Sequence, residues 1–247
     1  MGGPGRPGGR GGSPVPYDLL ASVIPFKRGW LVASAKLQGI QMYPNEPEVF
    51  ETLAEVLDYR PPFRAIALDA PIGLHTEPVD GGRSCDREAR RLLGWPRSGA
   101  ILTPPIRPAL TASSYKEAAR MCGRLSPVTW GRLPRIAEVD AEVASYRQRT
   151  IFEIHPEMSF YQLNGDQPMR YPKRDRIGMT ERYGVLKNKI PGIERLVDAK
   201  LPGVKRWHLL DAAACLWTCR RVVARALTRI PEDPEWDDEG LRMEIVR

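Results

Sequence analysis

Long apolar segments are missing from this sequence of 247 residues. No run of hydrophobic residues approaches the ~20 that a membrane-spanning helix needs. The richest stretch, residues 209–216, is short and contains Asp211. The first residues have no hydrophobic core of the kind found in signal peptides, so neither a membrane protein nor a secreted one is expected.

Cysteine and histidine are also scarce, with four and three residues respectively. None of Cys85, Cys122, Cys215 and Cys219 forms a CxxC pair, which argues against a structural zinc site. We expect buried thiols and a reducing, cytoplasmic compartment. The pattern GxxxxGK[ST] is absent as well, which argues against a P-loop enzyme.

The composition is that of a globular protein, with 42% hydrophobic and 27% charged residues, and it excludes a wholly disordered chain. Lys and Arg total 37 against 30 Asp and Glu, so the formal net charge is +7. This excess suits an anionic partner such as nucleic acid. It fits equally well a generally basic protein from a GC-rich genome.

The chain divides by composition into three parts. Residues 1–16 are almost all Gly, Pro and Arg, and such a segment buries too little apolar surface to offset its ordering entropy, so a disordered tail is expected. Residues 17–230 are expected to form a single domain. Residues 231–247 are expected to be an acidic, solvated C-terminal tail.

Within the domain, short apolar runs predict one central sheet. The strands are expected over residues 19–24, 30–37, 39–43, 63–68 and 150–155. The spacing of apolar residues predicts a helix over residues 46–57, and the longest helical pattern covers residues 208–229. This order of elements indicates a mixed α/β domain with helices on the faces of the sheet.

Asp69 is the first candidate for chemistry. It follows an apolar strand and precedes Pro71 and Gly73. A carboxylate at the carboxyl end of a central strand stands over the crevice where open α/β sheets bind ligands. The alternative is an aspartate that caps a turn through nearby backbone N–H groups.

The segment Glu153-Ile-His155-Pro-Glu157 is the second candidate. Glu153 and His155 project to the same side of a strand, and Glu157 begins the next helix. Two carboxylates and an imidazole at a strand end are able to hold a divalent metal or to transfer protons. The alternative is that Glu157 caps the helix and His155 bonds a carbonyl.

Asp211 is the third candidate, followed by three alanines in the long helix. A charge there is costly without a partner or a metal, unless it only complements the helix dipole. His208 lies three residues earlier and faces the same way. Asp69, Glu153 or Glu157, and Asp211 together match the needs of two-metal phosphodiester chemistry. Oxygen ligands would select Mg²⁺ or Mn²⁺.

Seven stretches of the sequence match those of a known family in order. They are RGWLVA (28–33), ALDAPIGL (67–74), CDREARRLLG (85–94), IAEVDAEV (136–143), FEIHPEMSF (152–160), GMTERYGVL (178–186) and LLDAAA (209–214). Through these motifs, which cover most of residues 23–223, the chain resembles the predicted ribonuclease-H-like nucleases catalogued as domain-of-unknown-function family 429 (DUF429).

The resemblance implies a ribonuclease-H-like α/β fold, in which a three-strand antiparallel meander and further parallel strands form a mixed sheet flanked by helices. It also implies metal-dependent phosphodiester hydrolysis. The expected catalytic residues are Asp69, Glu153, Glu157 and Asp211, and the expected metal ligands are Asp69, Glu153 and Asp211. Accessory roles are expected for His155, His208, Asp86, Asp140 and Arg182.

One position departs from the family pattern. Ile24 stands where the resemblance implies a first-strand aspartate that bridges both metals. Losing that ligand should weaken binding of Mg²⁺ or Mn²⁺ and reduce the rate, because such acids act as a unit. Two other functions therefore stay open, a catalytically silent nucleic-acid-binding protein of the same fold and a phosphoryl-transfer enzyme acting on a small molecule.

Two basic patches, within residues 83–97 and 170–176, are candidate contacts for a nucleic-acid backbone. The expected nucleic-acid-binding residues are Arg83, Arg87, Arg90, Arg91, Lys173, Arg174 and Arg176. A solvated surface is the alternative for both patches. A protein partner would have the Pro-rich residues 104–108 and the acidic C-terminal residues as natural contacts, and the sequence identifies no such partner.

Overall fold

The computed structural model describes residues 16–26 and 29–247, so the tail predicted for residues 1–16 lies outside the described residues except for Pro16. A six-stranded sheet has the order β3-β2-β1-β5-β6, and β4 also pairs with β2. The strands are β1 (Asp18–Phe26), β2 (Gly29–Gln38), β3 (Gln41–Pro44), β4 (Glu48–Phe50), β5 (Ala65–Leu68) and β6 (Ile151–Glu153).

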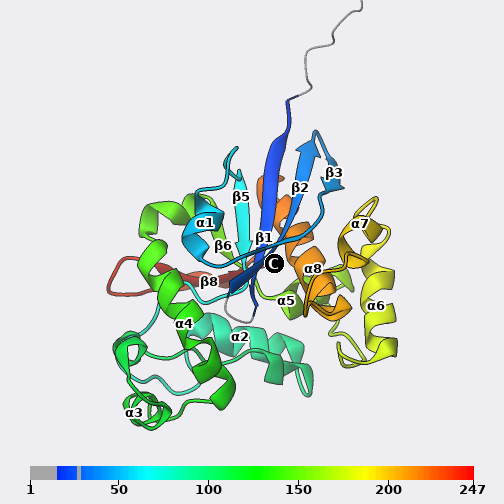
Figure 1. Ribbon diagram of the computed structural model, residues 1–247. Coiled ribbons are helices and arrows are strands. Elements are labelled where there is room, and N and C mark those ends of the chain that lie inside the picture. Colours follow the sequence, from blue (N-terminus) through cyan, green and yellow to red (C-terminus); the bar gives the residue numbers. More distant parts are fainter. Residues whose placement is uncertain (1–15, 27–28) are drawn as a thin grey trace, which may run out of the picture.

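The strand directions make this a mixed sheet. β1, β2 and β3 form an antiparallel meander, while β5 and β6 run parallel to β1. The carboxyl ends of β1, β5 and β6 therefore meet at one edge of the sheet, which is the lower edge in Figure 1. This arrangement confirms the predicted α/β fold class.

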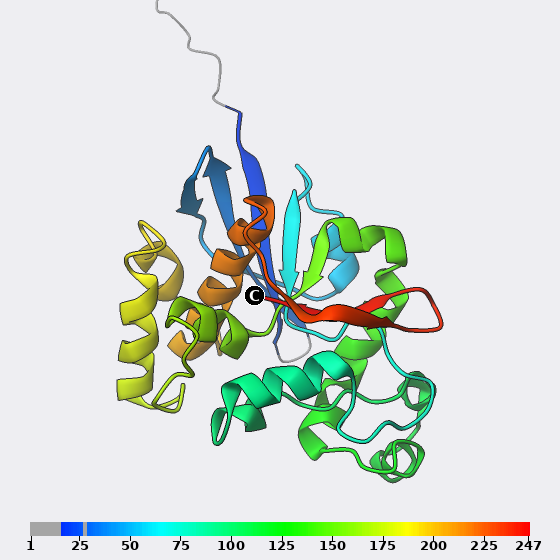
Figure 2. The same cartoon turned by 180° about the vertical axis from the view of Figure 1, so that it is seen from behind.

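Helices cover both faces of the sheet (Figures 1 and 2). One face packs against α8 (Arg206–Val223), which in turn contacts α5 (Pro156–Leu163), α6 (Arg176–Leu186) and α7 (Glu194–Val197). The other face carries α1 (Leu53–Leu57) and α4 (Pro127–Glu142). The remaining helices are α2 (Ser84–Leu93), α3 (Tyr115–Met121) and the 3₁₀ turns η1 (Arg97–Ala100), η2 (Arg107–Thr111) and η3 (Ser145–Arg149). In the described part of the chain, no helix has the length and apolar character that a membrane span requires.

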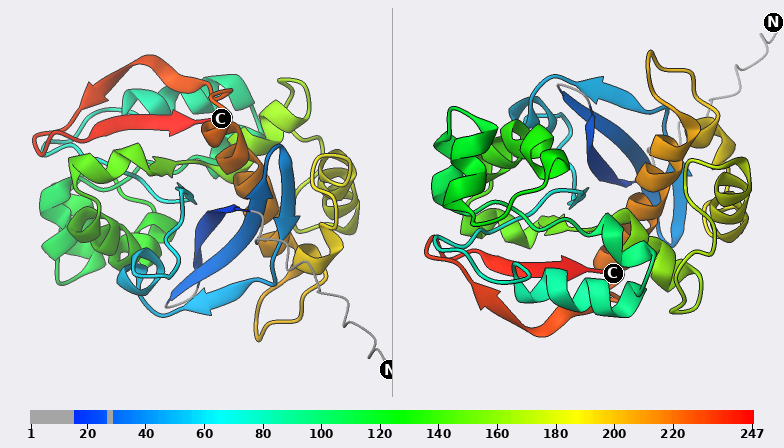
Figure 3. Two further views of the ribbon diagram at one scale, coloured as in Figure 1. Left: turned by 90° about the horizontal axis from the view of Figure 1, so that it is seen from above. Right: turned by 90° about the horizontal axis from the view of Figure 1, so that it is seen from below.

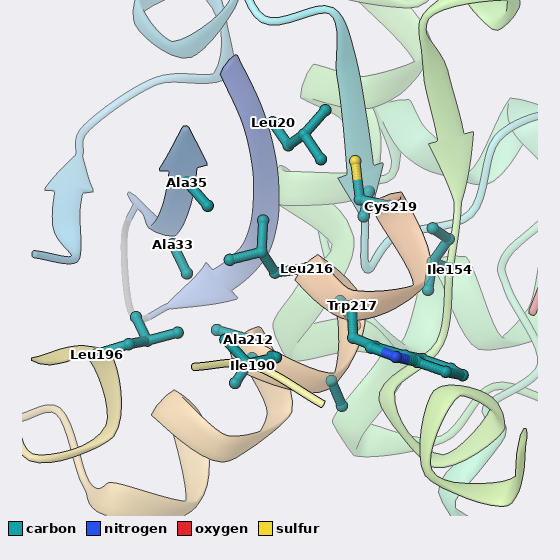
Figure 4. Close-up of a cluster of buried hydrophobic side chains, with 14 of the residues drawn as sticks. Leu20, Ala33, Ala35, Ile154, Ile190, Leu196, Ala212, Leu216, Trp217 and Cys219 are labelled. Atoms are coloured by element: carbon teal, nitrogen blue, oxygen red, sulfur yellow. The ribbon is translucent and has the colours of Figure 1, made fainter. Parts of the chain in front are cut away.

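Small side chains let α8 approach the sheet closely. Ala212 and Ala213 of the helix are fully buried. Figure 4 shows Ala212 and Leu216 in one hydrophobic cluster with Ala33 and Ala35 of β2. Apolar burial contributes roughly 25 cal/mol per Å², so this contact holds the helix firmly and fixes its polar residues relative to the sheet.

The C-terminal residues form a β-hairpin, which corrects the prediction of a solvated acidic tail over residues 231–247. β7 (Arg229–Trp236) and β8 (Arg242–Val246) pair antiparallel and lie along α2 (Figure 3). Ile230 and Ile245 are each 2% exposed and cluster with Cys85 and Ala89 of α2. Asp237, Asp238 and Glu239 lie between the two strands, and apolar residues of β7 and β8 anchor the segment to the domain.

The segment predicted as one helix over residues 46–57 is also different. Its first part is β4, in which Phe50 pairs with Trp30 of β2, and only Leu53–Leu57 are helical as α1. Thr52 separates the two elements, because its side chain accepts a hydrogen bond from the Glu55 backbone N–H and begins the helix. Pairing with the sheet edge therefore overrides the helical spacing of the apolar residues.

Candidate active site

Asp69 lies directly after β5, at the edge where the parallel strands end. Its backbone N–H donates to the Val23 carbonyl of β1 (2.9 Å), which continues the β1–β5 pairing by one residue. Ala65 and Ala67 of β5 belong to the cluster facing α8, and by alternation Asp69 faces that helix too. Because the residue is only 8% exposed, its carboxyl group is held between sheet and helix.

Asp211 belongs to the first turns of α8 and is 3% exposed. Lys173 Nζ donates a hydrogen bond to Asp211 Oδ2 at 2.6 Å. The other oxygen, Asp211 Oδ1, is buried and has no hydrogen-bond partner among residues 16–26 and 29–247. A buried carboxylate oxygen without a partner is costly, so this atom marks a place where a cation or a donor would be stabilised.

Burial raises the pKa of Asp69 from 3.8 to about 7. The like charges of Asp211 and Glu153 act in the same direction, whereas Arg132 and Lys173 oppose the shift. Asp69 is thus close to half-protonated at neutral pH. A carboxyl group with its pKa near the working pH is suited to exchange a proton or to ionise when a cation arrives.

Glu153, at the end of β6, already has hydrogen-bond partners within the protein for both carboxylate oxygens. Arg83 Nη1 and Nη2 donate to its two oxygens at 2.8 and 2.6 Å, and the Ile72 backbone N–H donates to Oε2 at 2.7 Å. Arg83 also pairs with Asp86 at 2.9 Å. Glu153 therefore joins β6 to the segment after β5, and its role as a metal ligand stays a prediction.

Glu157, in the first turn of α5, has a similar environment. Arg182 Nη2 donates to its two oxygens at 2.8 and 3.1 Å, and Arg182 is fully buried. His155 caps the same helix, because its Nδ1 accepts a hydrogen bond from the Glu157 backbone N–H (3.2 Å). Burial, with Lys173 and Arg132 nearby, lowers the pKa of His155 to about 3, so the imidazole is neutral at physiological pH.

The other accessory candidates have partners of their own. Asp86 pairs with Arg83 as described, and Asp140 accepts from Arg107 Nε at 3.0 Å. His208 Nδ1 accepts from the Lys205 backbone N–H at 2.9 Å, and burial lowers the pKa of this imidazole. These contacts explain the position of each side chain within the fold.

The predicted nucleic-acid contacts divide into exposed and internal residues. Arg83 is 2% exposed, so its place on a binding surface is corrected: it belongs to the buried network around Glu153. Arg90 donates to the carbonyls of Gly81 and Ile101, and Lys173 is engaged by Asp211. The exposed members of the set are Arg87, Arg91, Arg174 and Arg176.

A small cavity of about 50 Å³ lies beside Asp69, with Arg132, His155 and Thr103 also in its lining. It adjoins a larger open cavity of about 540 Å³, whose lining includes Thr103, Pro104 and residues 77–83. The larger volume is within the range of ligand pockets, about 300–1,000 Å³. The two cavities share Thr103 and Pro104 in their linings, and Asp69 lines the smaller one.

The described residues of the site leave few groups free to bind a metal. Ile24 follows Val23, the pairing partner of Leu68, and is buried at 6% exposure in the core facing α8. In the described ranges, no group of three or more His, Cys, Asp or Glu side chains is placed to hold a metal ion. Asp69 and the free Oδ1 of Asp211 are oxygen donors, the ligand type that Mg²⁺ and Mn²⁺ prefer.

Two features of the site were missed by sequence reasoning. Arg132 of α4 lies close enough to lower the pKa values of Asp69 and His155, but nothing distinguishes it in sequence among 37 lysines and arginines. Lys173 was expected to contact nucleic acid and instead bonds Asp211. The sequence did indicate that Asp211 requires a partner, because it is a charged residue within an apolar helix.

A family model described as "Protein of unknown function (DUF429)" matches residues 18–236. This match covers most of the chain and nearly all of the described domain. No curated protein and no solved structure matches the chain.

Proposed function

The chain belongs to the DUF429 family, and we propose that it is a metal-dependent nuclease of ribonuclease-H-like type that hydrolyses phosphodiester bonds. The observation that carries this proposal is the pair of buried carboxyl groups at the carboxyl edge of the sheet. Asp69 has a pKa raised to about 7, and Asp211 has an unpartnered oxygen, Oδ1, in the described structure. Both features are relieved when a cation binds between sheet and helix.

The proposed site uses fewer acids than the motifs suggest. Asp69 and Asp211 would hold one Mg²⁺ or Mn²⁺ ion, while Glu153 and Glu157 are ion-paired with Arg83 and Arg182. When bound, such an ion polarises a phosphoryl oxygen and lowers the pKa of a water molecule.

The remaining side chains give the site its charge. Arg132 and Lys173 bring positive charge to Asp69, which favours a phosphate group beside the carboxyl group. Arg174 and Arg176 are exposed immediately after Lys173, where they are available to a nucleic-acid backbone. Arg83 and Glu153 both bond the backbone of Ile72, and so they tie the end of β6 to the segment that follows Asp69.

A catalytically silent nucleic-acid-binding protein is the second candidate. It is favoured by Ile24, which is apolar where the resemblance implies a metal-bridging aspartate, and by the absence of a three-ligand group in the described residues. In that case the exposed arginines would bind the backbone without turnover.

A cleavage assay separates these functions. Single-stranded, duplex, hybrid and branched nucleic acids would be incubated with Mg²⁺, Mn²⁺ or EDTA. We expect metal-dependent cleavage that falls at least ~100-fold in Asp69→Asn and in Asp211→Asn. Asp233→Asn makes the same chemical change at an exposed position and serves as the matched control, with activity expected to remain.

The other outcomes are equally informative. No cleavage by the parent protein, together with retained salt-sensitive binding, would replace the nuclease by the silent binding protein. Neither cleavage nor binding would redirect the search to a small phosphorylated substrate or a protein partner. Cleavage that survives in both aspartate variants would overturn the assigned site.

We also place the protein in a reducing, cytoplasmic compartment. Cys85, Cys122, Cys215 and Cys219 are all free thiols. Free thiols of this kind are typical of chains kept reduced in the cytosol.

A further inference from the structure

Lys173 is the one residue that bonds a carboxylate of the proposed metal site directly in the described structure. Its Nζ is 2.6 Å from Asp211 Oδ2, and it lies over the Trp207 ring, 5.2 Å from the centroid. Its ammonium is therefore ion-paired with one of the two proposed metal ligands.

The segment that carries Lys173 is clamped to α6. Glu181 accepts hydrogen bonds from the backbone N–H groups of Arg170 (2.9 Å) and Tyr171 (3.1 Å). Arg182 Nη1 donates to the Tyr171 carbonyl at 2.9 Å. The same arginine also pairs with Glu157 of α5, so the segment is tied to two helices.

The contact of this segment with Gly178 is equally close. A Cβ atom at Gly178 would lie 1.9 Å from the Pro172 carbonyl oxygen, so only glycine allows the chain to pass there. Gly178, Glu181 and Arg182 of α6 thus hold the backbone beside Lys173. Because this backbone is fixed, the Lys173 ammonium is directed to Asp211 by the fold and is not a freely moving surface side chain.

Lys173 changes the net charge of the proposed metal site. Asp69 and Asp211 supply two negative charges when ionised, and Lys173 neutralises one of them. A site with one more carboxylate at position 24 and no lysine would be two charges more negative, which is the charge of one divalent ion. Ile24 and Lys173 together thus account for the charge that a second divalent ion would balance.

We propose that the Lys173 ammonium is a resident cation that takes the place of one metal ion at Asp211, so that the site binds a single divalent cation and binds it weakly. This inference rests on the proposed function, because it concerns the same two aspartates. It makes Lys173 a residue that sets metal stoichiometry and affinity, in addition to any contact with substrate. A divalent ion would be held by Asp69 and Asp211 Oδ1.

Direct metal binding tests the proposal. Mn²⁺ would be titrated into the metal-free full chain, with affinity and stoichiometry measured by calorimetry and by the loss of free Mn²⁺ signal in electron paramagnetic resonance. We expect one Mn²⁺ per wild-type chain. In Lys173→Met we expect affinity to rise about tenfold or more, equivalent to about 1.4 kcal/mol, because Asp211 Oδ2 is released and a repelling charge is removed.

Arg174→Met is the matched control. Arg174 also lies over the Trp207 ring, 5.1 Å from its centroid, and the variant removes one positive charge at the neighbouring position. The described structure gives Arg174 no bond to Asp211, so its effect on Mn²⁺ affinity should be clearly smaller. Thermal unfolding of each variant checks that it is folded. Lys173→Gln keeps a polar group near Asp211 and is a second control against a change in affinity caused by misfolding.

The outcomes separate the two proposals. Two Mn²⁺ ions per wild-type chain, or no tighter binding by Lys173→Met than by Arg174→Met, overturns the role of Lys173 and leaves the metal site intact. No Mn²⁺ binding by wild type or by either lysine variant overturns the metal site of the proposed function and this inference with it. Binding by Lys173→Met alone overturns the single weak metal of the wild-type chain and the metal-dependent function with it.

Discussion

Asp69 couples the protonation of the candidate site to the stability of the fold. Because burial raises its pKa from 3.8 to about 7, the folded chain binds this proton more tightly than the unfolded chain. The stabilisation is fully present below pH ~4 and is lost as the pH rises toward 7. Each unit of pKa shift corresponds to about 1.4 kcal/mol, so the loss amounts to at most ~4 kcal/mol.

Asp69→Asn removes this titration. In EDTA we expect the free energy of unfolding of the variant to rise relative to wild type between pH 4 and pH 7.5, by about 2–4 kcal/mol. Urea denaturation at fixed pH values measures it. The shifted pKa of His155 contributes in the opposite direction between about pH 3 and 6.5, and comparison of the two proteins at each pH cancels that contribution. Parallel stability curves for the two proteins would show that Asp69 ionises normally.

The two glutamates illustrate why sequence alone does not assign roles to acids. Glu153 and Glu157 occupy the positions in the EIHPE segment that predict metal ligation, yet each is buried against an arginine. Arg83 is 70 residues from Glu153 in the sequence and Arg182 is 25 residues from Glu157. No local spacing reveals such partners, and breaking a buried pair of this kind typically costs about 3–5 kcal/mol.

At the scale of elements, continuous apolar runs were the reliable signal. The strands expected over residues 19–24, 30–37 and 63–68 correspond to β1, β2 and β5, and the long helix α8 ends at Val223 instead of residue 229. These elements are buried on both sides or along a long face. Their apolar side chains therefore follow a pattern that predicts the element directly. The position of Asp69 at the end of β5 followed from this pattern.

Elements that depend on distant pairing were not predictable in the same way. β4 forms because β2 offers an unpaired edge, and its three residues resemble the first turn of a helix when read alone. The hairpin of β7 and β8 exists because α2 presents Cys85, Ala89 and Leu93 to it. In both cases the deciding contact comes from a segment far away in the sequence.

The integration of the hairpin leads to a stability prediction. Ile245→Ala should destabilise the protein by about 2–4 kcal/mol, because it leaves a cavity in the cluster between β8 and α2. Chemical denaturation measures this loss. Trp236→Ala removes a larger side chain that is 62% exposed, and it should change stability by less than about 0.5 kcal/mol. Equal, small effects of both substitutions would contradict the packed hairpin and favour a solvated tail over residues 231–247.

For the whole molecule, the net charge of +7 becomes meaningful only when its distribution is known. Several basic side chains are buried inside the protein and do not contribute to its surface charge, among them Arg83 and Arg182. Arg174 and Arg176 are exposed next to the lysine that bonds Asp211. Arg60 is exposed before β5, at the opposite edge of the sheet from Asp69. A bound nucleic-acid strand that reaches Asp69 should therefore meet the first pair and not Arg60.

This distribution predicts how binding responds to salt. On duplex DNA, each lost phosphate contact lowers the slope of log Kobs against log salt by about 0.9. Arg174→Gln and Arg176→Gln should each reduce the slope by that amount, whereas Arg60→Gln, an identical change of charge, should leave it unaltered. Fluorescence anisotropy with a labelled duplex between 50 and 200 mM salt, roughly the range over which such contacts are resolved, provides the slopes. Equal reductions in all three variants would mean that the basic charge acts diffusely and that the edge around Asp69 and Asp211 does not direct the strand.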